Sequence, residues 1–173
     1  MKKFFILLAL VLPCFAPATN ATVPALSATV QSASKPADDS AFDLSKYAEL
    51  DVYFNTNITR DMIEQGAALA PEMTTYGLSG DLLTKLDNFH IVIFDSEACM
   101  KVMQKDLKTL RKSKKYNEVS SQSSIEDKNI FVRQDGNAYK EIIAYYKIDD
   151  ICFILQFVGN FSETDVSQIT GGI

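Results

Sequence analysis

Residues 89 to 107 contain the side chains that hydrolases and thiol enzymes use. Ten consecutive positions hold a histidine, two carboxylates, a serine and a cysteine, namely His90, Asp95, Ser96, Glu97 and Cys99. A thiol nucleophile needs a base within hydrogen-bond reach, so the question is whether Cys99 and His90 can meet. If residues 90–94 are extended, they separate His90 from the end of that strand by roughly 13 Å, and Cys99 lies a helical turn further on.

A junction between a strand and a helix explains the same residues without catalysis. Asp95 or Ser96 suits a helix N-cap, and Glu97 places negative charge in the first helical turn, where the helix dipole favours it. His90 is the only histidine of the chain, so the sequence offers no second base and no histidine-rich metal site. We predict no catalytic residues, metal site or cofactor. The alternative is a thiol-dependent enzyme or redox protein that uses Cys99, with His90 or Cys152 in support.

The elements that position these residues follow from apolar spacing and helix caps. The first half of the folded part predicts a strand over residues 50–54 and then a helix capped at Thr56 or Asn57 that carries Ile58, Met62, Leu69 and Met73. A brief helix after Ser79, a strand over 89–94 and a long helix to about Lys112 follow. The second half predicts the strands NIFVRQ, YKEIIAYYKI and ICFILQFVGN and a short helix from Ser162. Tight turns join the last strands, which must therefore be antiparallel. The fold class predicted is α+β, a two-layer sandwich with helices packed on one face of a mainly antiparallel sheet of about four to six strands.

The turn at Asp149 and Asp150 determines which residues of the last two strands share a face. One face is strongly apolar and includes Ile142, Ala144, Tyr146, Ile148, Ile151, Phe153, Leu155 and Phe157. The opposite face, called the mixed face below, carries Ile143, Tyr145, Ile154 and Val158, interleaved with Glu141, Lys147 and Gln156. A face that is neither core nor cleanly polar is a candidate binding surface, and Ile143, Tyr145, Ile154 and Val158 are its predicted binding residues. The alternative is a scatter of exposed apolar residues, or coverage by the leader or the last helix.

The two cysteines of the folded part are predicted not to pair. The alternation of the strand places Cys152 on the mixed face, whereas Cys99 lies on the apolar side of the long helix, which we expect to pack on the apolar face. The sulfurs would then lie on opposite sides of the sheet, and a disulfide requires Cα atoms within about 7 Å.

The N-terminus has the pattern of a secretory signal peptide. Lys2 and Lys3 precede an apolar run of roughly nine residues, which is short of the about 20 needed to span a bilayer. Small residues predict cleavage after Ala18 or Ala21, giving a signal peptide over residues 1–21. Residues 22–41 are rich in Ala, Ser, Thr and Pro and are predicted to be a flexible leader. Residues 42–173 then form a single domain.

Cys14 raises the alternative of a lipoprotein, because a cysteine behind an apolar run can carry the lipid. Pro13 precedes it, where lipoprotein processing usually requires a small residue. We therefore expect export without lipidation, and contact with the membrane only during export or through lipid at Cys14.

The net charge of the chain limits the classes of partner that it can bind. The chain has 22 acidic and 17 basic residues and a net charge of −5, which makes nucleic acid a poor partner. The long helix nevertheless carries a row of lysines at helical spacing, comprising Lys101, Lys105, Lys108, Lys112 and Lys115. Phospholipid headgroups or another anionic partner could use this row, and a solvated helix face is the alternative.

Three segments and the closing strands are similar to one known family. The segments are FDLSKYAELDVYFNTNITRDM, ALAPEM and GLSGDLLTKLDNFHIVIFDSE, and the similarity covers roughly Phe42 to Ile169. They resemble small exported proteins, of the Bacteroides envelope type typical of anaerobic gut bacteria, that carry a domain of unknown function. The resemblance implies the fold and an envelope location, and it supplies no activity or catalytic residues. Many relatives look like lipoproteins, and the pair Pro13-Cys14 departs from that pattern.

The sequence as a whole predicts an exported domain of the periplasm or cell envelope without catalytic activity. We expect it to bind another envelope protein or a small apolar ligand through the mixed face. The remaining alternatives are the thiol-dependent enzyme and a purely structural secreted domain.

Overall fold

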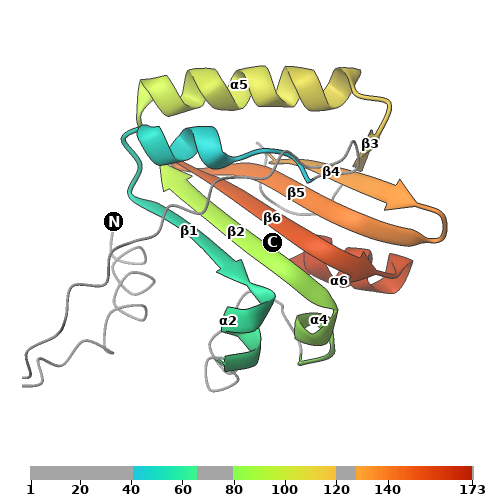
Figure 1. The fold of residues 1–173 in the computed structure, drawn as a ribbon. Coiled ribbons are helices and arrows are strands. Elements are labelled where there is room, and N and C mark those ends of the chain that lie inside the picture. The colour runs from blue at the N-terminus through green and yellow to red at the C-terminus, as the bar shows by residue number, and fades with distance from the viewer. Residues whose placement is uncertain (1–40, 66–79, 120–127, 173) are drawn as a thin grey trace, which may run out of the picture. The chain divides into compact units, whose positions relative to one another are not determined.

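The computed structural model describes residues 41–65, 80–119 and 128–172 (Figure 1). All of them belong to one compact unit that starts at Asp38. The expected signal peptide and nearly all of the expected leader lie outside the described residues, as do Leu69 and Met73 of the first expected helix. In the described residues, no helix is long and apolar enough to cross a membrane.

The described elements alternate between helices and strands in the first half and are mainly strands in the second. In chain order they are the 3-10 helix η1 (Ser45–Glu49), β1 (Phe54–Thr59), α2 (Arg60–Gln65), α4 (Gly80–Lys85), β2 (Leu86–Phe94), α5 (Glu97–Lys112), β3 (Tyr116–Val119), β4 (Lys128–Asp135), β5 (Ala138–Ile148), β6 (Ile151–Phe161) and α6 (Glu163–Gly172).

The strands form one six-stranded sheet in the order β1-β2-β6-β5-β4-β3, and every neighbouring pair is antiparallel. The predicted α+β class is therefore confirmed. The expected register of the last hairpin is also confirmed, because Ile148 pairs with Ile151, and Ile142 pairs with Phe157. Asp149 adopts a positive φ of 55° in the two-residue turn between these strands, a conformation that Asp tolerates better than most residues.

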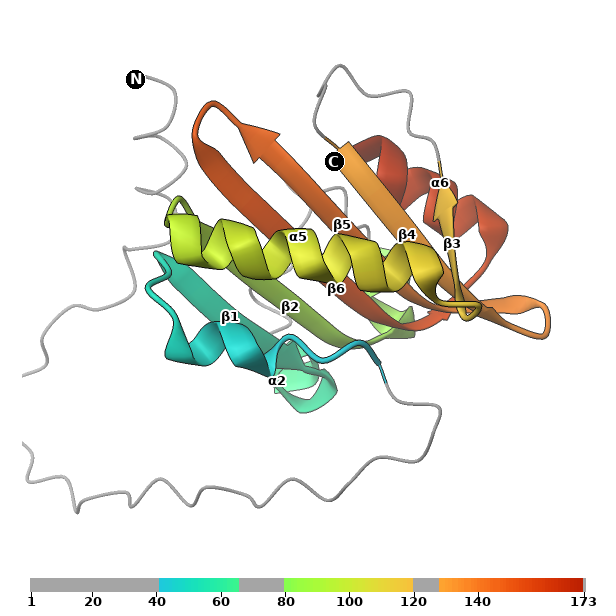
Figure 2. The same cartoon turned by 90° about the horizontal axis from the view of Figure 1, so that it is seen from above.

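Helices cover both faces of the sheet (Figure 1). The apolar face of β5 and β6 packs in one cluster with α4 and α6, through residues such as Leu82 and Ile169. The mixed face packs in a second cluster with η1 and α5, through Tyr47, Cys99 and Leu110. Figure 2 shows α5 crossing above the strands, with η1 beside it. The expectation that helices lie on one face alone is therefore incomplete, because the apolar side of α5 packs on the face that the sequence left open.

The first strand begins later than the sequence predicted. The strand expected over residues 50–54 is found at Phe54–Thr59, and the helix after it begins at Arg60. Thr56 and Asn57, expected to cap that helix, instead pair with Ile91 and His90 of β2. Strand propensity depends strongly on neighbours, and pairing with β2 places this polar segment in the sheet.

Candidate functional site

The mixed face does not form an open binding surface. Ile143 and Ile154 are completely buried, Tyr145 is 1% exposed, and Val158 is partly buried. The prediction of an exposed face is wrong, because α5 and η1 pack against it. The four predicted binding residues therefore belong to the interior of the protein or its margin.

Cys99 and His90 do not form a catalytic pair. Cys99 is completely buried, and its Sγ donates a hydrogen bond to the carbonyl oxygen of Asp51 at 3.4 Å. His90 Nε2 lies 2.6 Å from Asn55 Oδ1, and burial of the imidazole lowers the pKa of His90. The capping interpretation is confirmed, since Ser96 Oγ accepts a hydrogen bond from the Cys99 amide at 3.3 Å.

Cys99 and Cys152 lie on the same side of the sheet. Both are buried members of the cluster under α5, and neither forms a disulfide. The reason given for their separation is therefore wrong, because α5 packs on the face that carries Cys152 rather than on the opposite one. Among the described residues, no group of three or more His, Cys, Asp or Glu side chains could hold a metal ion.

A buried carboxylate organises the polar part of the interior. Glu141 of β5 is completely buried, and its Oε2 accepts hydrogen bonds from Tyr116 Oη at 2.7 Å and Arg133 Nε at 3.2 Å. Its Oε1 accepts from Gln156 Nε2 at 2.7 Å and from the Phe42 amide at 2.9 Å. A buried charge is tolerated only when its lone pairs are satisfied in this way.

This network joins four strands to the chain segment before η1. Gln156 Nε2 also donates to the Phe42 carbonyl at 2.7 Å, so both backbone polar groups of Phe42 are bound. Burial, and then the neighbouring Glu141, raise the pKa of Tyr116, so its hydroxyl keeps the proton that it donates to Glu141. The network as a whole holds the side chain of Arg133 in one position, and Arg133 is only 7% exposed.

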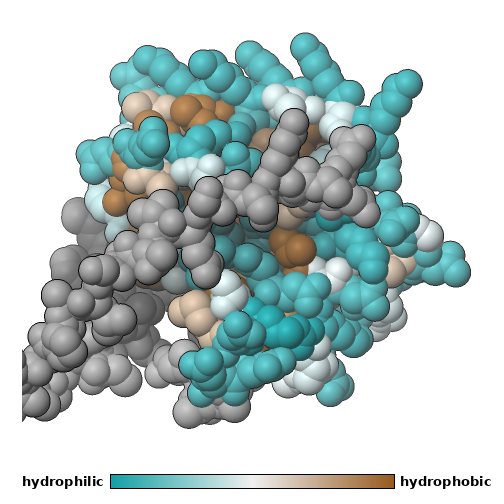
Figure 3. Space-filling model, viewed as in Figure 1, coloured by the Kyte–Doolittle hydropathy of each residue, from teal (hydrophilic) through white to brown (hydrophobic). Residues whose placement is uncertain are grey.

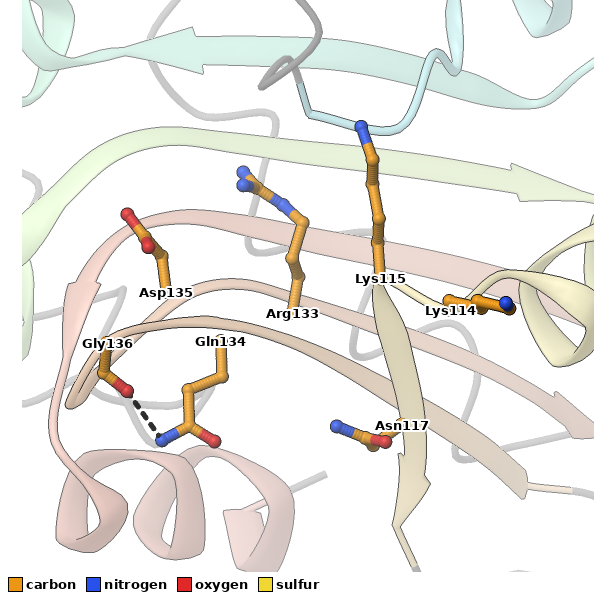
Figure 4. Close-up of a pocket in the computed structure, with 7 residues that line it drawn as sticks. All are labelled: Lys114, Lys115, Asn117, Arg133, Gln134, Asp135 and Gly136. Carbon is orange, nitrogen blue, oxygen red and sulfur yellow. Dashed lines mark hydrogen bonds between the residues drawn. The ribbon is translucent and has the colours of Figure 1, made fainter.

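Arg133 also lines a surface pocket of about 430 Å³. The other lining residues are Lys114, Lys115, Asn117, Gln134, Asp135 and Gly136. Figure 4 shows Arg133, Lys115 and Asp135 pointing to one side of β3 and β4, while Gln134 and Asn117 point to the other. The pocket therefore wraps around the end of the short strand β3.

The sheet register explains why a hollow forms at this point. Pairing of β3 with β4 starts at Tyr116 and Arg133, and β4 continues through Gln134 and Asp135. The chain before Tyr116 comes from the end of α5, so Lys114 and Lys115 do not continue the ladder. Gly136 closes the other wall in a turn that needs its positive φ of 58°, and its carbonyl accepts a hydrogen bond from Gln134 Nε2 at 3.1 Å.

The pocket has the chemistry of an anion site. Three of its side chains are cationic and one is acidic, and none of the lining residues is apolar. Carboxylate and phosphate groups are the anions that Arg and Lys bind in proteins. Geometry of this kind binds and orients a charged group, and no Ser, Thr, Cys or His is among the lining residues.

Part of this site could be anticipated from the sequence. Lys115 appears in the predicted lysine row, and Glu141 and Gln156 appear among the polar residues of the mixed face. Arg133 was missed, although it lies two residues from Phe131 on the same face of β4, so that the alternation of the strand places it beside Glu141.

A second polar group lies between η1 and α5. Asp106 of α5 is 4% exposed and accepts hydrogen bonds from Lys46 Nζ and, at 2.9 Å, from Tyr47 Oη. Burial, and then Asp106, raise the pKa of Tyr47. The nearby hydroxyl of Tyr145 is buried and has no hydrogen-bond partner in the described part of the protein. This group fixes η1 against α5.

Fold and pocket together define an α+β domain with an antiparallel sheet covered on both faces and a basic pocket at one edge. Residues 47–169 match the family described as Domain of unknown function (DUF4252), and the chain belongs to this family. Neither a curated protein nor a solved structure matches the chain. The resemblance to a family with a domain of unknown function is thereby confirmed.

Proposed function

We propose that the protein is an exported, non-catalytic domain of the cell envelope that binds an anionic group in the pocket formed by Lys114, Lys115 and Arg133. The observation that carries this proposal is the position of Arg133. Arg133 lines the pocket, and its guanidinium is held by the buried carboxylate of Glu141. A preorganised guanidinium binds a carboxylate or phosphate with a smaller loss of side-chain entropy than a mobile one.

The ligand proposed here differs from the small apolar molecule expected from the mixed face. That face is buried under α5 and η1, whereas every lining residue of the pocket is polar, charged or glycine. A charged group, carried by a small molecule or by another envelope component, fits this lining. Lys114 and Lys115 are exposed and can adjust to it.

Export is proposed from the N-terminal pattern. Lys2 and Lys3 followed by an apolar run and small residues are typical of a signal peptide. Expression of the full chain in a bacterial host tests this, by mass spectrometry of the protein recovered from the envelope fraction. The expected product begins at Thr19 or Thr22, and an intact N-terminus retained in the cytoplasm would contradict export.

Anion binding is tested by thermal and urea unfolding of the chain that begins at Thr22, with inorganic phosphate and with acetate as separate ligands. At a phosphate concentration about ten times its Kd, the free energy of unfolding should rise by about 1.4 kcal/mol. Replacement of both Lys114 and Lys115 with Gln should remove most of this increase.

The matched control replaces Arg60 of α2 and Lys128 at the start of β4 with Gln, which changes the net charge equally away from the pocket. A difference between phosphate and acetate would identify the preferred anion. If neither anion stabilises the wild-type protein, or if the two double variants respond alike, the pocket is not an anion site and a purely structural role is favoured.

A further inference from the structure

The outer side of α5 carries a straight row of lysines. Lys101, Lys105, Lys108 and Lys112 are all exposed. At 100° per residue their side chains fall within an arc of about 60°, along about 16 Å of the helix axis. A plane parallel to the helix can therefore contact all four ammonium groups at once.

Charge is separated between the two helical layers of the domain. α5 holds five basic and two acidic residues, a formal charge of +3. The helices on the opposite face, α2, α4 and α6, hold two basic and five acidic residues, a formal charge of −3. The chain as a whole is acidic, with a net charge of −5. An anionic surface would thus attract the α5 side and repel the opposite side.

The lysine row is also the part of its layer that projects outward. Figure 1 shows α5 as the outermost element on its side of the sheet. Figure 3 shows hydrophilic residues along the upper rim of the molecule, where α5 runs, and hydrophobic residues beneath them. Among the described residues, the exposed large hydrophobic side chains are Tyr53, Met62 and Ile148, and none of these belongs to α5.

We infer that the lysine row of α5 docks the domain on the surface of a bilayer that contains anionic phospholipid. Protein interfaces are depleted of Lys at their centres and rely on aromatic residues and Arg, and the row has neither. Rows of lysine without apolar anchors suit a flat, fluid array of phosphate headgroups, which they bind from outside the hydrocarbon. The inference rests on the proposed function only in requiring export to an envelope membrane.

The row and the pocket form one basic surface. Lys114 and Lys115 follow α5 after its C-cap residue Ser113, and both line the pocket. A domain that lies with α5 on the bilayer therefore brings the pocket near the headgroup layer, where a phosphate can enter it.

The expected effect can be measured by vesicle co-sedimentation. Each lysine near an anionic surface raises the partition coefficient on the order of five-fold, and the screening length of about 10 Å at 0.1 M salt leaves this attraction intact at contact. The chain beginning at Thr22 should sediment with phosphatidylglycerol-containing vesicles at low salt. It should not sediment with pure phosphatidylcholine vesicles, and roughly 1 M salt should release it.

The decisive comparison is between two double variants of equal charge. Lys105→Gln with Lys108→Gln should lower the partition coefficient on the order of 20-fold. Arg60→Gln with Lys128→Gln, on the side of the sheet that carries α2 and α6, should change it by less than about three-fold. Circular dichroism verifies that both variants keep the fold, which is expected because the lysines of the row are exposed.

Equal losses in the two double variants, or no sedimentation of the wild-type protein at low salt, would overturn the inference and leave an acidic protein as the partner to consider for α5. Phosphate-induced stabilisation, measured on the Lys105→Gln, Lys108→Gln variant, separates this result from the pocket proposal. Stabilisation that persists without vesicle binding refutes only the membrane inference. Vesicle binding without stabilisation refutes only the pocket.

Discussion

Glu141 and Arg133 form an ion pair inside the protein, with Arg133 Nε 3.2 Å from Glu141 Oε2 and side chains that are 0% and 9% exposed. The same carboxylate receives hydrogen bonds from Tyr116, Gln156 and the Phe42 backbone. One side chain thereby connects the edge strand β3, the central strands and the segment before η1. The pair also holds Arg133 at the wall of the pocket.

Replacement of Glu141 with Ala should lower the free energy of unfolding by about 3–5 kcal/mol, because it leaves a buried guanidinium without its carboxylate. Urea unfolding measures the loss. Replacement of Glu118, whose exposed carboxylate pairs with Arg111, is the matched control and should cost less than about 1 kcal/mol. Similar losses in the two variants would mean that the Glu141 network adds little to stability.

Two buried tyrosines on the mixed-face side should respond differently to loss of their hydroxyl. Tyr47 Oη donates to Asp106 at 2.9 Å, so Tyr47→Phe should destabilise the protein by about 1–3 kcal/mol. Tyr145 Oη is buried without a partner in the described residues, so Tyr145→Phe should leave stability unchanged or raise it slightly. Thermal unfolding of both variants tests this, and a larger loss for Tyr145→Phe would contradict the assignment.

Gly159 of β6 is required by a close approach of two backbones. A Cβ at this position would collide with the carbonyl oxygen of Lys85 and lie 2.9 Å from the ring of Phe161. Gly159→Ala should therefore cost about 1–3 kcal/mol or more. Gly171, in α6, has no neighbour within 4 Å of such a Cβ, and its replacement with Ala should be neutral or slightly stabilising. Chemical denaturation compares the two, and equal stability would mean that β6 and Lys85 can separate without cost.

The free energy of unfolding should decrease as the pH falls below the pKa that His90 has in the unfolded chain. Burial lowers the pKa of His90 from 6.5 in the folded protein, and Asp43 opposes this weakly. Below about pH 6.5 the unfolded state therefore binds more protons than the folded state, and the free energy of unfolding decreases with falling pH. Urea unfolding of the wild type and of His90→Gln at pH 7.5 and 5.5 should show a smaller decrease in the variant.

A separate decrease in the free energy of unfolding is expected at acidic pH. Hydrogen bonds with Ser45 lower the pKa of Asp43 from 3.8. Burial raises the pKa of Asp165, but Lys85 and Ser162 outweigh burial, so that this pKa is also lowered from 3.8. Their contribution is present above about pH 4 and is lost as the pH falls further.

The His90 prediction has its own contradicting outcome. If His90→Gln and the wild type lose stability equally between pH 7.5 and 5.5, another group is responsible for that change.

The two thiols of the folded part should be unreactive. Cys99 and Cys152 are both completely buried and neither is in a disulfide, and thiol reactivity requires an accessible thiolate. In the chain beginning at Thr22, a thiol reagent should modify both cysteines after denaturation and neither, on the same time scale, before it. Rapid modification of Cys99 in the native protein would restore the thiol-enzyme alternative.

Several parts of the fold could be predicted because they depend on local chemistry. Ser96 and the apolar spacing after it define α5 to Lys112, and the two Asp residues of the turn determine the register of the last hairpin. β1 was misplaced because it contains Asn55 and Asn57, and Asn is depleted in strands; its position is set by pairing with β2. The segment that contains the short strand β3 is also polar, and only its pairing with β4 identifies it as a strand.

The sequence by itself determined the antiparallel strands, their turns and which residues share a face, because alternation along a strand is a local property. Tertiary structure alone decided what covers each face. Both faces of β5 and β6 are apolar enough to accept a helix, and α5 packed on the one that carries Tyr145 and Ile154. That choice buried the predicted binding surface and brought Lys115, which follows α5, to the pocket that Arg133 lines.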